Sequence, residues 1–486
     1  MKRVITLLLA AGLVLGAASA SQAIDFKASG WFLFGAGLGD RSIADGGNDK
    51  FMVTQRVRTQ IEVIADENLK GVLHFEIGHL NWGKGGENTA GNGGGGALGS
   101  DGVNLKTRYA YIDWIIPQTD VKVRVGLQNF SLPTFAGLGA VIMGGGGSDG
   151  AGVTVSTSFT ENVAASLFWL RAYDQDGADA EDSLDFVGLT IPLSFDGVKF
   201  TPWGMYAAIG NDMWDGASGT GLGKTDAGGC VELRNLLPQG AYSNYGSFDD
   251  DKGDGWWVGF AAQVTTLDPF KIAVDAAYGS TDLGTVGDYD MERSGWYVAV
   301  NLEYKTEYGV PGLKFWYTSG DDDDPYDGSE QMPTIHNDIA VSTYSFDGPA
   351  YNGINCLLGT SIIGTWGAQL YWDKLSFIDN LSHKISVMYM NGTNHSAMAG
   401  KVYGDAGTAI TPYNSNCGYQ SYLTTEDYAI EVGIDTTWQI YKNLKMVLEL
   451  GYIYLDLDED VWGSWSEIDT YNENNFRANL QLIYQF

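Results

Sequence analysis

The sequence predicts an all-β protein, a transmembrane antiparallel up-and-down β-barrel of about 18 strands, with 16 strands as the alternative. Three observations predict it: apolar and polar residues alternate with period two, short and long connections take turns along the chain, and the chain ends on an aromatic residue, Phe486. The strand number depends on two segments with a weaker pattern, residues 153–159 and 184–193. A barrel must close, because each unpaired backbone group in hydrocarbon costs several kcal/mol.

The composition excludes several classes of protein. The 486 residues include 66 Gly, 13% aromatic residues and only 18% charged residues, with a formal net charge of −32. Abundant aromatic residues argue against disorder, and the negative charge argues against a nucleic-acid partner. A mean hydropathy of −0.11 excludes a bundle of membrane helices but fits barrel strands, whose alternation averages near zero.

The N-terminus has the pattern of an export signal. Two basic residues at positions 2 and 3 precede an apolar stretch over residues 4–18, and small residues follow up to Ala23. The apolar stretch is short for a membrane span of ~20 residues. We therefore expect residues 1–23 to be a signal peptide and residues 24–486 to form one barrel.

The last segment shows the alternation most clearly. Residues of one parity are apolar: Phe476, Ala478, Leu480, Leu482, Tyr484 and Phe486. Residues of the other parity are mostly polar: Arg477, Asn479, Gln481, Ile483 and Gln485. The same period recurs around residues 121–128, 270–278, 296–305 and 444–454. Residues 26–34 supply a first strand, with which the last strand must pair to close the barrel.

The connections between these segments have two lengths. Short ones with hairpin-turn residues lie at 65–71, 117–120, 195–197, 267–269 and 441–443. Long ones rich in Gly, Asp, Asn and Ser lie at 83–102, 129–150, 210–255, 320–360 and 394–424. Short periplasmic turns with long external loops are typical of outer-membrane barrels.

A soluble β-sandwich is the alternative fold, since its strands also alternate. Segments of about 10–14 residues favour a barrel that crosses a membrane. Six tryptophans at segment ends are interpreted as interfacial girdles: Trp31, Trp82, Trp114, Trp256, Trp372 and Trp438.

The polar parity must face the lumen. Arg56 and Arg58 share one face, and a basic residue on the lipid face costs ~2–4 kcal/mol at the midplane. The same face carries charged residues in several segments: His74, Glu76, Lys106, Arg108, Lys122, Arg124, Asp275, Glu431, Asp435 and Glu449. Charges without full pairing need water, so the lumen is expected to be a water-filled pore.

At this point the sequence resembles the general bacterial porins, and in detail the homotrimeric porins of sulfate-reducing bacteria. The features that carry the resemblance are the export signal, the Leu480–Phe486 ending, the Arg56-Val57-Arg58 segment and the residues 67–76 that resemble a porin hairpin. The resemblance implies a homotrimer in which each protomer holds its own pore. It also implies that the third long loop of the family, which corresponds here to residues 129–150, folds inward.

The resemblance further implies a basic cluster on the wall opposite acidic residues of the third loop. Candidates for pore lining and constriction are Arg56, Arg58, Lys106, Arg108, Lys122, Arg124, Glu76 and Asp149. Asp149 is the only acid of the loop, beside a run of glycines, which departs from the family pattern. Narrowing by Phe130, Phe135 and Met143 is the steric alternative.

Acidic runs in the external loops suggest Ca²⁺ ligands, with Asp321, Asp323, Asp250 and Asp254 as weak candidates. Neither run completes a calcium loop, because Lys252 occupies a position that needs a ligand. A solvated anionic surface is the favoured interpretation. No cofactor is expected.

Histidines and cysteines give no catalytic pattern. His74 and His79 lie on opposite strand faces, and no nucleophile elbow accompanies them, so we do not expect an enzyme. Cys230, Cys356 and Cys417 fall in predicted external loops, where one disulfide is allowed but its pairing is undetermined.

The sequence therefore predicts an outer-membrane porin of a Gram-negative bacterium that passes small hydrophilic solutes and ions by diffusion. Its expected surroundings are outer-membrane lipid and lipopolysaccharide. Two alternatives remain: a substrate-selective channel with a binding site in the lumen, and a structural surface protein. The charge selectivity stays open, because acidic loops favour cations and the basic wall favours anions.

Overall fold

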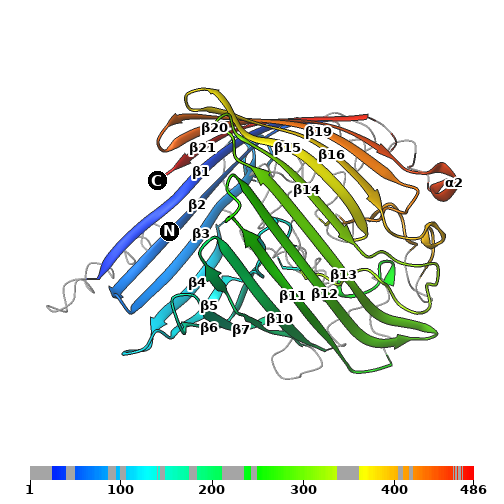
Figure 1. The fold of residues 1–486 in the computed structure, drawn as a ribbon, viewed down its shortest axis with the longest axis horizontal. Helices are drawn as coiled ribbons and strands as arrows, with labels where there is room; N and C mark the ends of the chain where they lie inside the picture. The colour runs from blue at the N-terminus through cyan, green and yellow to red at the C-terminus, as the bar shows by residue number, and fades with distance from the viewer. Residues whose placement is uncertain are drawn as a thin grey trace.

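The protein is one closed antiparallel β-barrel (Figure 1). The computed structural model describes residues 24–39, 50–85, 95–98, 105–139, 141–142, 148–174, 183–210, 235–241, 249–335, 361–402, 409–414, 420–463, 465, 468, 472 and 474–486. Among these residues, no helix has the length and apolar character to cross a bilayer.

Each strand pairs with its neighbours in the sequence. The first half comprises β1 (Asp25–Gly39), β2 (Lys50–Asp66), β3 (Leu69–Asn81), β4 (Leu105–Ile115), β5 (Lys122–Asn129), β6 (Asp149–Ser158), β7 (Ala164–Asp174), β8 (Ser183–Thr190), β9 (Leu193–Phe195) and β10 (Val198–Gly210). The second half comprises β11 (Lys252–Val264), β12 (Phe270–Val286), β13 (Tyr289–Tyr304), β14 (Val310–Thr318), β15 (Thr365–Ile378), β16 (Leu381–Gly392), β19 (Tyr428–Tyr441), β20 (Leu444–Asp456) and β21 (Asn474–Gln485). A small pair, β17 (Tyr413–Asn414) with β18 (Gln420–Ser421), and a short helix, α2 (Glu459–Trp462), lie in outer loops.

The barrel has 18 strands, as the sequence predicts. The sheet contains 19 segments, but β8 and β9 both pair with β10 and form one strand interrupted at Ile191 and Pro192. Proline has no N–H to donate, which accounts for the break. Both weakly patterned segments are strands, so the 16-strand alternative is wrong.

The first and last strands close the barrel. β1 pairs with β21 from Trp31 opposite Gln485 to Gly39 opposite Arg477, and in Figure 1 the blue β1 lies beside the red β21. The last residue continues the pairing, since Gly30 and Phe486 exchange two backbone hydrogen bonds of 3.0 Å. Among the described strands, the barrel sheet therefore has no open edge.

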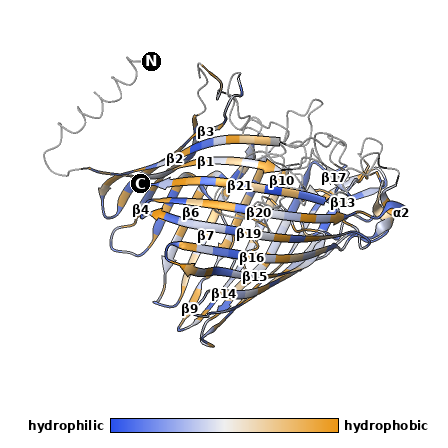
Figure 2. Cartoon of the chain, turned by 90° about the horizontal axis from the view of Figure 1, so that it is seen from above, coloured by the Kyte–Doolittle hydropathy of each residue, from blue (hydrophilic) through white to orange (hydrophobic). Residues whose placement is uncertain are grey.

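Short turns and long loops lie at opposite ends, as predicted. The start of β1 and the end of β21 lie at the end of the short turns, such as Glu67-Asn68, Asp196-Gly197 and Lys442-Asn443. The strand ends that the long connections join lie at the other end of the barrel, together with α2 (Figure 2). One outer connection is short, because β12 and β13 extend beyond the other strands and meet in a hairpin at Gly287.

The two faces of each strand differ as the alternation predicts, and Figure 2 shows the change of hydropathy along the strands. In β21 the inward Arg477, Asn479 and Gln481 are each 1% exposed, whereas the outward Leu480 is 43% exposed. The outer surface is therefore apolar although it is accessible, which is what a lipid-facing surface requires.

Aromatic side chains form the expected girdles with one exception. Trp82 and Trp256 are exposed near the loop end, and Trp114, Trp372 and Trp438 near the turn end. The sequence predicts Trp31 as a girdle residue, and this prediction is wrong. It lies on the inner face of β1, packed against Leu33, Val447 and Ile483. Its parity, rather than its place near a strand end, decides where its ring points.

Candidate functional site

A cluster of basic residues surrounds one carboxylate on the inner face of β2–β4. Glu76 Oε2 accepts hydrogen bonds from Arg58 Nε at 2.6 Å and Arg108 Nη1 at 3.2 Å, and Arg56 Nη1 lies 3.8 Å away. Lys106 is the register partner of Glu76 on β4. The position of Glu76 follows from alternation, which places it on the same face as Arg56 and Arg58 of the paired strand.

Arg108 connects this cluster to the start of β6. Its Nε donates to Asp149 Oδ2 in a close ion pair, and its side chain is only 4% exposed. Asp149, which the sequence places in the third loop, is the first residue of β6. Arg56, Arg58, Glu76, Lys106, Arg108 and Asp149 are called the Glu76 cluster below.

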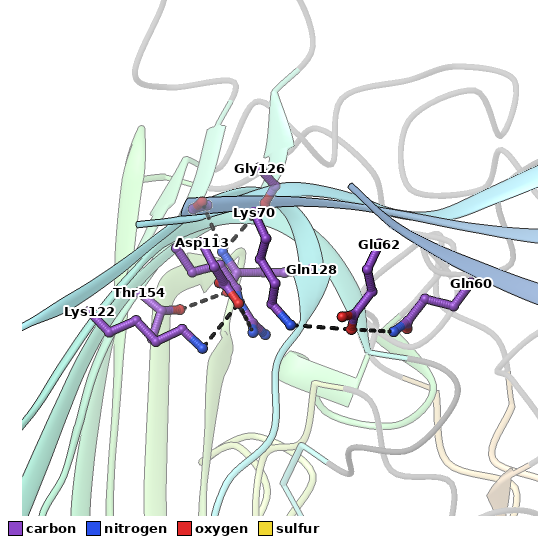
Figure 3. Close-up of polar contacts among 10 residues, drawn as sticks. Gln60, Glu62, Lys70, Asp113, Lys122, Gly126, Gln128 and Thr154 are labelled. Atoms are coloured by element: carbon purple, nitrogen blue, oxygen red, sulfur yellow. Dashed lines mark hydrogen bonds and ion pairs between the residues drawn. The ribbon is translucent and has the colours of Figure 1, made fainter. Parts of the chain in front are cut away.

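A second group of charges, the Asp113 cluster, lies on β4 and β5. Arg124 Nε and Nη2 donate to the two oxygens of Asp113 at 2.6 and 2.9 Å, and Lys122 Nζ lies 3.0 Å from Asp113 Oδ2. Figure 3 shows Lys122 reaching toward Asp113. A bidentate pair of this kind fixes the guanidinium plane.

Next to these charges, Figure 3 shows Lys70 extending toward Glu62, which also accepts a hydrogen bond from Gln60. Lys70 Nζ is 3.2 Å from Glu62 Oε1, and Gln60 Nε2 donates to the same oxygen at 3.3 Å. Their side chains are partly exposed, so this part of the wall is accessible to water.

Aromatic rings support the guanidinium groups. Arg56 and Arg58 lie over the ring of Trp31 at 5.2 and 5.3 Å, and Arg124 lies over Tyr111 at 4.0 Å. Cation–π contacts hold the cations against the wall without neutralising them. The result is a fixed row of positive charge along the inner face of β2–β5.

The sequence did not identify Asp113 and Tyr111 as inward residues. A β-bulge between β3 and β4 changes the parity, because Lys106 faces Glu76 whereas Tyr109 faces His74. Arg108 occupies the extra position, so residues after it point inward on odd numbers. A prediction that assumes strict alternation across residues 105–115 misses this shift, because the sequence carries no clear signal for the bulge.

The third long loop folds into the barrel and contacts the opposite wall. Thr134 Oγ1, Phe135 N and Ala136 N donate to the carboxylate of Asp275 on β12, at 2.6, 2.8 and 2.9 Å. Tyr297 on β13 donates to the carbonyl oxygen of Leu138 at 3.1 Å. The loop therefore spans from β5 to β12 and β13.

The three loop residues that the sequence suggests as steric narrowing of the pore, Phe130, Phe135 and Met143, have different surroundings. Phe130 is 4% exposed and packs against Phe168 of β7 with ring centroids 5.6 Å apart. Phe135 is partly buried at the contact with Asp275, and Met143 lies outside the described residues. Phe130 therefore secures the base of the loop rather than facing the lumen.

Other outer loops fill the lumen next to the third loop. Arg293, which is fully buried on β13, donates to the carbonyl of Leu237 at 3.0 Å and to Gln331 Oε1 at 2.8 Å. Gln331 donates to Asn394 Oδ1 at 2.6 Å, and Ile335 N donates to the carbonyl of Val141 at 3.1 Å. One hydrophobic cluster joins these loops to inner faces of strands from β7 to β20.

The passage through the barrel is thus off-centre. Inner residues of β10–β16 such as Trp257 and Trp316 are fully buried beneath the loops, whereas Arg124 and Lys122 have side chains 28% and 39% exposed. Partly exposed charges of the inner surface lie on the wall of β2–β5 and also on β12 and β13, where the side chains of Lys271 and Glu303 are 26% and 20% exposed.

The predicted calcium ligands do not come together. Asp321 is buried, and its carboxylate accepts hydrogen bonds from Ser329 Oγ at 2.6 Å and from the Tyr422 hydroxyl at 2.7 Å. Asp323, Asp250 and Asp254 are exposed. Within the described residues, the carboxylates whose oxygens lie within 4.8 Å of one another are Asp322, Asp327 and Glu330. The three cysteines lie outside the described residues, as does the side chain of His79.

Comparison with known proteins gives matches of fold. Neither a protein-family model nor a curated protein sequence matches the chain. Among solved structures, a BenF-like porin from Pseudomonas fluorescens Pf-5 aligns with a TM-score of 0.51 and 9% identity, over 95% of this chain and 98% of that chain. OccAB1 from Acinetobacter baumannii aligns with a TM-score of 0.51 and 14% identity, over 94% and 97%. The outer membrane protein opdK from Pseudomonas aeruginosa aligns with a TM-score of 0.50 and 8% identity, over 95% and 98%. The chain therefore shares its overall fold with these three proteins.

Proposed function

We propose that the protein is a porin in the outer membrane of a Gram-negative bacterium, a water-filled channel for passive diffusion of small hydrophilic solutes and ions. The observation that carries the proposal is a closed barrel whose outer face is apolar and whose inner face carries partly exposed charges. A dry core would not hold such charges, whereas a solvated lumen does.

The direct test is single-channel recording of the detergent-extracted protein in a planar bilayer. We expect stepwise conductance that grows with salt concentration, from protein whose gel mobility changes on heating. Folded, heat-modifiable protein without conductance would contradict the channel and favour a structural surface protein.

The wall gives the channel a charge bias toward anions. The Glu76 cluster holds four basic residues against two acids, and the Asp113 cluster holds two against one. Low-dielectric walls focus this field in the lumen, while the exposed aspartates of the outer loops favour cations only at the mouth. The reversal potential in a KCl gradient measures the sign.

A substrate-selective channel is the second candidate function. The observation in its favour is that Trp31, Tyr109 and Tyr111 share a wall with the guanidinium groups, so an anionic solute would meet both rings and charges. Saturable block of conductance by a small organic anion would favour this candidate over general diffusion.

The resemblance to homotrimeric porins supports assembly as a trimer embedded in lipid and lipopolysaccharide. Native mass spectrometry of the detergent-extracted protein tests it, and a monomeric mass would overturn it.

A further inference from the structure

We propose that Asp275 is the latch that holds the third long loop across the lumen and thereby sets the width of the channel. The inference rests on the hydrogen bonds of the Asp275 carboxylate. Its conductance test rests in addition on the proposed function, because it requires that the protein form a channel. Asp275 is a positioning residue in this account, because it acts on solutes through the loop.

The carboxylate is placed to bind the loop. Asp275 lies on the inner face of β12 and is 1% exposed, so burial of its charge requires strong hydrogen bonds. Three donors supply them: Thr134 Oγ1, Phe135 N and Ala136 N, about 140 residues away along the chain. Both oxygens are occupied by the same turn of the loop.

The turn is shaped to present these donors. Gly137 N donates back to Thr134 Oγ1 at 3.2 Å, and Gly137 has a φ of +79°, which L-residues rarely adopt. Successive backbone N–H groups that converge on one point form an anion-binding nest. The loop therefore presents a set of hydrogen-bond donors that fits the Asp275 carboxylate.

A second contact point keeps the latched loop in place. Leu138, which follows the turn, is fully buried and accepts a hydrogen bond from Tyr297 on β13. Beyond it, Val141 accepts a hydrogen bond from Ile335 of the loop after β14. Removing Asp275 would leave three donors of the turn without their acceptor, and the loop would lose its charged attachment to the wall.

The test compares Asp275→Ala and Thr134→Val with wild type in single-channel recordings. We expect Asp275→Ala to raise the conductance by on the order of two-fold and to increase current fluctuations, with a smaller effect for Thr134→Val, because conductance follows pore width. Asp373→Asn, which removes another inward carboxylate on β15, is the control for lost charge alone. Unchanged conductance in Asp275→Ala would overturn the latch.

A cross-link restores the latch by other means. In a background with Cys230, Cys356 and Cys417 changed to Ser, Thr134→Cys is combined with Asp275→Cys, because the side chains of Thr134 and Asp275 are in hydrogen-bond contact. Oxidation is expected to return the conductance to the wild-type value and reduction to widen the channel. Equal conductance in both redox states would contradict the proposal.

Amide exchange tests the latch without any conductance. The amides of Phe135 and Ala136 are expected to be protected in wild type and to exchange at least tenfold faster in Asp275→Ala, while β12 amides stay protected. If wild type forms no channel but this difference appears, the proposed function fails and the latch stands. If exchange is unchanged, the latch fails whatever the conductance.

Discussion

At the residue scale, the charged wall depends on how many of its cations are neutralised. Glu76 forms ion pairs with three guanidinium groups, whereas Asp113 forms ion pairs with Arg124 and Lys122. Because each carboxylate has more than one basic partner, positive charge is left over on the wall. The rings of Trp31 and Tyr111 hold it in place.

Removing that charge should change ion selectivity. The triple variant Arg56→Ala, Arg58→Ala, Arg124→Ala is expected to shift the reversal potential toward cations, on the order of 10 mV in a tenfold KCl gradient. Asp113→Asn should shift it toward anions. Arg171→Ala is the matched control, since this guanidinium lies on the outer face and pairs with Asp185 and Asp174. An equal shift in the control would remove the cluster from the conducting path.

A second prediction at this scale concerns Glu330 in the loop after β14, outside the membrane-spanning segments. Burial, with the nearby carboxylates of Asp321 and Asp322, raises the pKa of Glu330 to about 7. The neutral acid is favoured in the folded loop, so its stabilisation is complete below the ordinary pKa of 4.5 and is lost as the pH rises through about 7.

Amide exchange in residues 322–330 should therefore be slower at pH 5 than at pH 8 after correction for the intrinsic rate. Glu330→Gln mimics the neutral acid and should abolish the difference, while Asp249→Asn, in another outer loop, should preserve it. A pH difference that survives in Glu330→Gln would assign it to other groups.

At the scale of single strands, alternation decides which face meets lipid and which meets the lumen. Val57 lies between Arg56 and Arg58 on β2, yet it belongs to the outer face. A shift of one residue would place both arginines in lipid, so the register of this strand is strongly fixed.

An arginine introduced on each face tests this assignment. Val57→Arg is expected to destabilise the folded barrel by ~2–4 kcal/mol, because the lipid face at mid-depth does not solvate a cation. Gln60→Arg, on the inner face of the same strand, should cost much less. Urea-induced unfolding in lipid vesicles measures both, and equal destabilisation would contradict the lumen assignment.

At the scale of the whole molecule, closure of the barrel rests on the pairing of β1 with β21. The pairing runs over nine residue pairs and continues to the reciprocal bonds between Gly30 and Phe486. Without it, two strand edges would be exposed to hydrocarbon.

Deletion of residues 476–486 should therefore prevent assembly. We expect loss of the heat-modifiable folded band and of membrane insertion, because each unpaired backbone group costs several kcal/mol. Phe486→Leu retains the backbone pairing and is the control. A truncated chain that still folds and inserts would show that β1 does not need β21.

The sequence by itself determined the barrel, a strand number of about 18 with 16 left open, the end that carries the long loops and the inward position of Arg56, Arg58, Glu76 and Asp275. These features depend on a period of two and on local turn residues, which are properties of short stretches of chain. The inward position of Asp113 and Trp31 was missed, since a bulge shifts one strand and a girdle position was assigned from nearness to a strand end.

Only the tertiary structure decided where the third loop goes, which carboxylate pairs with which guanidinium, and that the outer loops bury inner residues such as Trp257 and Trp316. Each of these depends on contacts between residues far apart in the chain, such as Thr134 with Asp275. Such contacts are set by barrel closure and loop packing, and no local pattern in the sequence encodes them.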